Sequence, residues 1–84
     1  MENTTRKYLD ETTNFSSEDA KFMEMAIRLS CENIDSGGGP FGAVIVRDGE
    51  VIATGTNRVV PNSDPTAHAE VMAIRNACAK LGTF

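Results

Sequence analysis

The residues best suited to chemistry lie in the stretch "DPTAHAEVMAIRNAC", Asp64 to Cys78, which holds the only histidine of the chain. That histidine, His68, stands two positions before Glu70. Catalytic zinc takes three protein ligands and one water molecule, whose pKa then falls to about 7. A carboxylate that does not bind the metal can shuttle the proton of that water. We therefore predict that His68 is a zinc ligand and Glu70 a general acid/base. The alternative is a structural histidine, held by hydrogen bonds near a helix start.

The two cysteines do not complete such a site. Cys78 follows His68 by ten residues on one predicted helix, which separates them by about 15 Å at 1.5 Å per residue. Two ligands of one zinc ion lie only about 4 Å apart. Cys31 lies in another predicted helix and has no C-x-x-C partner. We expect both cysteines to be reduced, buried and inert, so the chain supplies one ligand where three are needed.

A first helix is predicted from Ser16 or Ser17 to about Asp35. Either serine can cap it, and two acidic residues follow in the first turn, where the helix dipole favours anions. The "SGGGP" segment then stops the helix. The apolar residues of this helix recur at helical spacing and predict a face that packs on a sheet. The stripe comprises Phe22, Met25, Ala26 and Leu29.

A β-hairpin is predicted next. Phe41 to Val46 form a nearly continuous apolar run, which indicates a strand covered on both faces. Asp48-Gly49 is a strong signal for a two-residue turn, and Glu50 to Thr56 form the return strand.

A last helix is predicted from Asp64-Pro65 to Gly82. Asp64 suits the N-cap, Pro65 the first helical position and Gly82 the C-cap. Helical spacing predicts two stripes, a core stripe and a narrow stripe of alanines that would allow a neighbour to approach closely. The core stripe is Ala67, Val71, Ile74, Cys78 and Leu81, and the narrow stripe is Ala69, Ala73 and Ala77.

Composition and charge limit the classes of function. The chain has 84 residues and a net charge of −4 with no basic cluster, so we expect no nucleic-acid partner. No apolar run approaches the roughly 20 residues that span a bilayer, and the first residues lack a signal-peptide core. We therefore predict a cytoplasmic protein. Residues 1–15 are interpreted as a polar leader. Because a lone hairpin is marginal in water, we expect further strands from outside this chain.

Several segments in order resemble the cytidine/deoxycytidylate deaminase superfamily. They are "GGGPFGAVIV", "DG", "GTNRV" and "DPTAHAEVMAIRNAC". Within the superfamily, their sequences are most similar to those of guanine deaminases. The resemblance implies a three-layer α/β/α fold, with residues 16–84 as its helix–hairpin–helix first half. It also implies zinc-dependent hydrolytic deamination of a purine base, guanine to xanthine plus ammonia, by a homodimer in the completed protein.

The same resemblance assigns roles to individual residues. It implies that His68 binds zinc and that Glu70 is the general acid/base. Asn57 matches a base-binding asparagine, Phe41 an aromatic residue at the purine pocket, and the backbone N–H of Ala69 a substrate contact. Two plainer interpretations remain open at this point. Phe41 could be a core residue, and Asn57 could merely end a strand.

One departure from the family pattern is large. Zinc deaminases carry a P-C-x-x-C element after the H-x-E element, and this chain has none. The two thiolates must therefore come from outside it, and the chain alone is expected to be inactive. Two alternatives stay open beside the guanine deaminase hypothesis. One is a tRNA adenosine deaminase, and the other is an inactive fragment or structural module. Guanosine and adenine also remain open as substrates.

Overall fold

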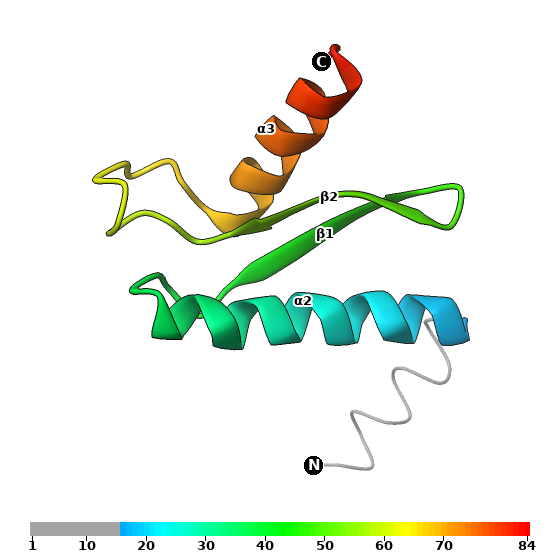
Figure 1. Ribbon diagram of the computed structural model, residues 1–84, viewed down its shortest axis with the longest axis horizontal. Helices are drawn as coiled ribbons and strands as arrows, with labels where there is room; N and C mark the ends of the chain where they lie inside the picture. Colours follow the sequence, from blue (N-terminus) through cyan, green and yellow to red (C-terminus); the bar gives the residue numbers. More distant parts are fainter. Residues whose placement is uncertain (1–15) are drawn as a thin grey trace, which may run out of the picture.

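The computed structural model describes residues 16–84 as two helices around one β-hairpin (Figure 1). The elements are α2 (Ser17–Asp35), β1 (Gly42–Arg47), β2 (Glu50–Thr56) and α3 (Ala69–Leu81). The predicted leader, residues 1–15, lies outside the described residues. Within residues 16–84, no helix is long and apolar enough to cross a membrane.

Helix α2 begins and ends where the sequence predicts. The Ser16 hydroxyl accepts a bond from the Asp19 backbone N–H at 3.0 Å, and the Asp19 carboxylate accepts one from the Ser16 N–H at 3.3 Å. This capping box satisfies two N–H groups that have no partner inside the helix. At the other end the Ser36 N–H donates to the Asn33 carbonyl, and Gly37 turns the chain with a φ of 90°.

Strands β1 and β2 pair antiparallel, and Gly42 lies opposite Thr56. The connecting turn is the predicted one. Asp48 and Gly49 have φ values of 52° and 78°, the two positive angles that a tight I′ hairpin turn requires. The first strand begins at Gly42 and ends at Arg47, one residue later at each end than predicted.

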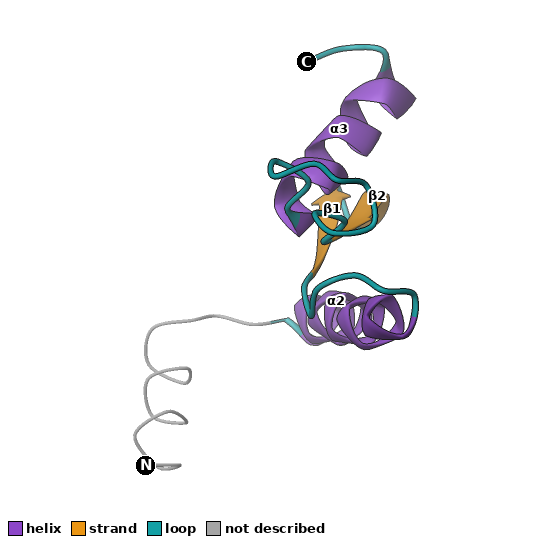
Figure 2. Ribbon diagram, turned by 90° about the vertical axis from the view of Figure 1, so that its left-hand side faces the viewer, coloured by secondary structure: helices purple, strands orange, loops and turns teal. Residues whose placement is uncertain are grey.

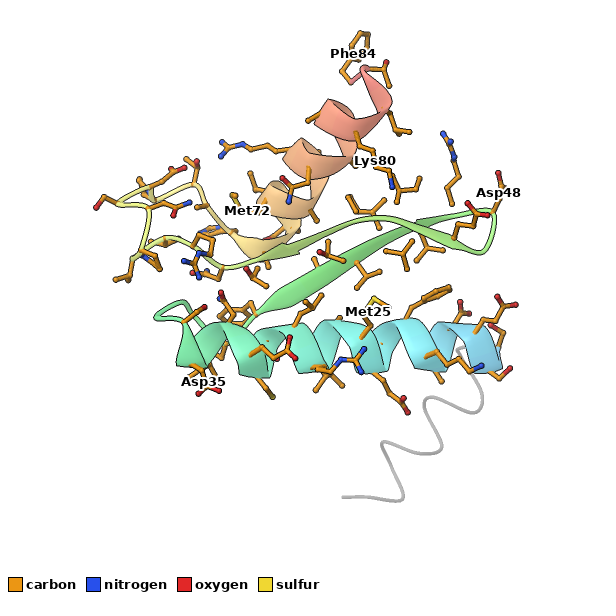
Figure 3. All side chains as sticks on the ribbon, in the orientation of Figure 1. Met25, Asp35, Asp48, Met72, Lys80 and Phe84 are labelled. Carbon is orange, nitrogen blue, oxygen red and sulfur yellow. The ribbon has the colours of Figure 1, made fainter. Side chains whose placement is uncertain are left out.

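The two helices cover opposite faces of the hairpin, which Figure 2 shows end-on between them. Two glycines allow this close packing. A Cβ atom at Gly42 would meet the Ala26 carbonyl of α2 at 2.5 Å, and one at Gly55 would overlap backbone atoms of Ala69 and Ala73 in α3. Figure 3 shows Met25 directed from α2 toward the hairpin and Asp35 directed away. The predicted helix–hairpin–helix order and its three layers are confirmed.

The predicted start of the last helix is wrong. Helix α3 begins at Ala69. Its N-cap is His68, which lies four residues after the predicted N-cap, Asp64. The Asp64 carboxylate instead accepts bonds from the N–H and hydroxyl of Thr66, at 2.9 and 2.7 Å. The Ala67 N–H donates to the Asp64 carbonyl at 3.1 Å. Asp64 and Pro65 therefore start a tight turn that ends before the helix begins. Proline is favoured at the second position of such a turn.

The predicted core stripe of α3 is also largely wrong. Of that stripe only Ala67 is buried, whereas Ile74 is 54% and Leu81 41% exposed. The physical reason is the close approach at Gly55, which turns the small residues of α3 toward β2. The predicted narrow stripe is the one that is buried, and it consists of Ala69, Ala73 and Ala77.

The burial predicted for the cysteines fails as well. Both thiols are free, as expected, but Cys31 is exposed and Cys78 is half-buried. Cys31 follows Leu29 by two positions, and a helix turns about 100° per residue. This rotation places Cys31 away from the stripe that packs on the sheet.

Candidate functional site

All five predicted site residues line one cavity. It has a volume of about 440 Å³ and opens where β1 begins, β2 ends and α3 begins. A volume of this size suits a small-molecule ligand. Gly42 and Ala43 also line the cavity and were not singled out from the sequence. The lining residues are Phe41, Gly42, Ala43, Asn57, His68, Ala69 and Glu70.

His68 presents an unused imidazole at this cavity. Its backbone is extended, with φ −72° and ψ 154°, and its carbonyl accepts the Met72 N–H at 2.8 Å. Unlike most capping side chains, the imidazole makes no bond to the helix that it caps. The side chain is exposed and is therefore free to bind a ligand or a metal ion through either nitrogen.

The first turn of α3 adds hydrogen-bond donors to the same wall. The first intrahelical bond runs from the Met72 N–H. In residues 16–84, the backbone N–H groups of Ala69, Glu70 and Val71 therefore have no partner. Such groups carry the positive end of the helix dipole and favour developing negative charge. The exposed carboxylate of Glu70 lies in this turn and lines the cavity.

Phe41 and Asn57 form the facing wall. The Asn57 N–H donates to the Phe41 carbonyl at 3.2 Å, so β1 and β2 hold the two residues beside each other. The Asn57 Oδ1 accepts the Val59 N–H at 3.2 Å. Its Nδ2 has no partner among the described residues and can donate to a ligand. Phe41 is 59% exposed, so it is not a core residue of the described chain.

A turn before His68 fixes the position of the N-cap. The Arg58 N–H donates to the Ala67 carbonyl at 2.8 Å, which ties this turn to the chain that follows β2. The hydroxyl and then the backbone N–H of Thr66 lower the pKa of Asp64, with a further contribution from Arg75. The Arg75 guanidinium lies 3.4 Å from the Asp64 Oδ2 and joins α3 to the same turn.

The zinc ion that the sequence predicts needs three protein ligands. His68 offers one imidazole nitrogen, a fitting zinc ligand. Among residues 16–84, however, no three histidine, cysteine or acidic side chains gather closely enough to hold a metal ion. Cys78 lies near the far end of α3 and Cys31 is exposed on α2. The described residues therefore supply one fitting ligand and do not complete a zinc site.

Residues 16–84 match the model of the family described as the cytidine and deoxycytidylate deaminase zinc-binding region. The chain belongs to this family. The match covers the capped helix, the hairpin and the helix that begins at His68, which are the elements that surround the cavity.

Individual relatives agree with this assignment. The chain is 58% identical to the guanine deaminase of Bacillus subtilis over 64 residues, which are 75% of this chain and 41% of the relative. It is 44% identical over 62 residues to the tRNA-specific adenosine deaminase of Aquifex aeolicus, again 41% of that protein. The chain thus spans about two fifths of the length of these relatives.

Solved structures show the same likeness. The crystal structure of Bacillus subtilis guanine deaminase superposes with a TM-score of 0.75 at 56% identity, over 77% of this chain and 42% of the other. A tRNA:A34 deaminase gives the same TM-score at 44% identity, over 79% and 51%. The described residues therefore have the fold of the first part of these deaminases.

Proposed function

We propose that this chain forms the first half of the active site of a zinc-dependent guanine deaminase, which converts guanine and water into xanthine and ammonia. The observation that carries the proposal is the gathering of Phe41, Asn57, His68, Ala69 and Glu70 around one cavity. Identity to a guanine deaminase at 58% supports the choice of substrate. Because the chain spans two fifths of that relative, the activity belongs to the completed domain.

In this proposal His68 supplies one zinc ligand, and the other two come from outside the described residues. A zinc ion held there would lower the pKa of water toward neutrality. Glu70 removes a proton from the attacking water and delivers it to the departing amine, so that the leaving group is neutral ammonia. Its place in the first turn of α3, at the cavity wall, suits this role.

The remaining residues bind and orient the base. Asn57 donates from Nδ2 to an acceptor on the purine edge, because its Oδ1 is engaged by Val59. Phe41 offers an exposed aromatic face, on which a flat purine can stack. The free N–H of Ala69 donates to the purine at the helix start. Together these contacts hold the reacting carbon of the base beside Glu70.

A tRNA adenosine deaminase is the second candidate. The likeness to a tRNA:A34 deaminase, with the same TM-score as the guanine deaminase, favours it. Against it stand the lower sequence identity, 44% against 58%, and the net charge of −4 without a basic cluster. A surface that binds RNA is usually basic.

Two chimeras distinguish these candidates. In the guanine deaminase chimera, this chain replaces the matched part of the Bacillus subtilis enzyme. In the tRNA deaminase chimera, it replaces the matched part of the Aquifex aeolicus enzyme. We expect the first to release ammonia from guanine and the second to leave tRNA adenosine unchanged. Editing of tRNA by the second and no turnover by a folded, zinc-loaded first would favour the second candidate. Inactivity of both would favour a non-catalytic fragment.

A further inference from the structure

Asn33 is the one buried polar residue among residues 16–84, with 4% of its surface exposed. It lies near the end of α2 and does not line the cavity. A buried amide is costly unless each of its donors and acceptors is paired. Burial of this asparagine therefore depends on full pairing of its amide group.

Every hydrogen-bonding group of the Asn33 side chain has a partner. Its Nδ2 donates to the Gly39 carbonyl at 2.9 Å and to the Asn57 carbonyl at 2.7 Å. Its Oδ1 accepts from the Arg58 Nη1 at 2.8 Å and from the Ser36 hydroxyl at 3.4 Å. Two donors and two acceptor sites are all that an amide side chain offers. The amide is thus fixed in one orientation.

These bonds close a ring behind the facing wall of the cavity. Gly39 accepts from Asn33 and also from the Phe41 N–H, while the Phe41 carbonyl accepts from the Asn57 N–H. The ring leaves no space for a side chain at Gly38, where a Cβ atom would overlap the Asn33 amide and the Asn57 carbonyl. Asn33 therefore braces the backbone of the two residues proposed to hold the base.

The same amide reaches the opposite wall through Arg58. The Arg58 guanidinium donates to Asn33 and to the Ser36 hydroxyl, and its backbone N–H donates to the Ala67 carbonyl, immediately before His68. Three segments far apart in the sequence are thereby joined behind the cavity. They are the glycine-rich segment after α2, the end of β2 and the turn before α3.

We propose that Asn33 is a positioning residue, which holds Asn57 at the geometry needed to bind the base. This inference rests on the proposed function, since it acts through the base-binding role of Asn57. Replacement by alanine removes both donors, which leaves the Asn57 carbonyl unpaired and the Gly39 carbonyl with only the Phe41 N–H as a partner. Replacement by aspartate keeps the shape but sets a carboxylate oxygen against those two carbonyls. Either change should shift Asn57, and a misplacement of about 1 Å costs about 10²-fold in rate.

The test measures kcat/KM for guanine in the guanine deaminase chimera. We expect Asn33→Ala and Asn33→Asp to lower it about 10²-fold. The matched control is Asn76→Ala, which also removes a bond from an asparagine amide to a backbone carbonyl. This bond runs from Asn76 Nδ2 to the Thr54 carbonyl at 2.8 Å, and neither residue lines the cavity. It should change kcat/KM less than about threefold. Equal losses in the control and in the Asn33 variants would overturn the inference.

A double-mutant cycle separates positioning from general damage to the fold. In an Asn57→Ala background, Asn33→Ala should lower kcat/KM by less than about tenfold, because the side chain that it positions is already gone. An undiminished loss would mean that Asn33 acts without Asn57. Gly38→Ala displaces the same ring with Asn33 intact, and its effect on kcat/KM should also be smaller in the Asn57→Ala background. The inference therefore stays testable even when an Asn33 variant does not fold.

A structural measurement separates this inference from the proposed function. An unsubstituted chimera that does not deaminate guanine would contradict the proposed function alone. The crystal structure of the Gly38→Ala or Asn33→Asp chimera then decides the positioning role without any assay of turnover. We expect segment 38–41 and Asn57 to be displaced relative to His68. An unchanged arrangement would overturn the inference whatever the substrate.

Discussion

Gly55→Ala should displace α3 and with it the two residues proposed for the chemistry. An added methyl carbon at Gly55 would lie 2.8 Å from the Ala73 Cα and would overlap the backbone of Ala69. Carbon atoms pack at about 3.5 Å or more, so α3 must withdraw by at least about 0.7 Å. Because the obstructing atoms belong to the helix backbone, no side-chain rotation can relieve the overlap.

The cost of this displacement can be estimated for stability and for rate. Overpacking of this kind costs about 1–3 kcal/mol, and the stiffer unfolded chain returns about 0.4–1 kcal/mol. The free energy of unfolding should therefore fall by about 1–2 kcal/mol. His68 and Glu70 move with the start of α3. Since a shift near 1 Å costs about 10²-fold, we expect kcat/KM for guanine to fall about 10–100-fold.

The assay combines urea unfolding and ammonia release in the guanine deaminase chimera. Asn76→Ala is again the control, because it weakens the same contact between α3 and β2 by about 0.5–1.5 kcal/mol without any overlap. It should lower stability by a similar amount and leave activity nearly unchanged. Full activity in Gly55→Ala, or equal losses in both variants, would refute the reasoning that α3 is positioned by its close approach to Gly55.

Two further predictions concern acid stability and metal affinity. Bonds from Thr66 hold the pKa of Asp64 below its ordinary value of 3.8, so its stabilising contribution is complete above that pH and is lost as the pH falls through the lowered pKa. The difference in unfolding free energy between the unsubstituted chimera and Asp64→Asn should shrink on acidification below pH 3.8, and a constant difference would contradict the assignment. The isolated chain should bind zinc much more weakly than the chimera. Loss of a hydrogen-bond partner behind a metal ligand already lowers metal affinity roughly 10–100-fold. The isolated chain is expected to lack two of the three ligands themselves. Equal affinity in equilibrium titrations would show that the count of ligands is wrong.

The elements that rest on local chemistry were predictable from the sequence. Ser16 and Asp19 form a reciprocal cap that needs no distant partner, and the Asp48-Gly49 turn follows from the positive φ angles that these residues tolerate. The bounds of α2 and of the hairpin were therefore right to within one residue. Their order followed from the apolar pattern, which also indicated a strand covered on both faces. The three layers followed from the family resemblance.

The start and the buried face of α3 depend on contacts between distant segments. Asp-Pro is compatible with a helix start and with a turn. The local bonds of Asp64 to Thr66 favour the turn, and the Arg58 N–H and the Arg75 guanidinium hold it from other segments. The buried face is selected by Gly55, which the sequence does not connect to α3. Side-chain size alone favoured the larger residues of α3, and the close approach reversed that choice.

The five residues proposed to act in the candidate site could be predicted from the sequence. The residue that braces them, Asn33, was not predicted. The five cavity residues came from motif and resemblance, and the structure places them around one cavity; their roles stay predictions. Asn33 was missed, although a signal exists. It continues the sheet-facing spacing four residues after Leu29, where a polar residue is out of place. Its partners, at the glycine-rich segment and after β2, become visible only in the fold.

The most direct test of the account is Glu70→Gln in the guanine deaminase chimera. Glutamine keeps the shape of the side chain but cannot carry the proton, so ammonia release from guanine should fall by about 10²–10⁴-fold while zinc content stays unchanged. Glu50→Gln makes the same change of charge at the exposed start of β2 and should leave the rate as it was. Turnover retained in Glu70→Gln would contradict the claim that this chain supplies the proton shuttle of a deaminase.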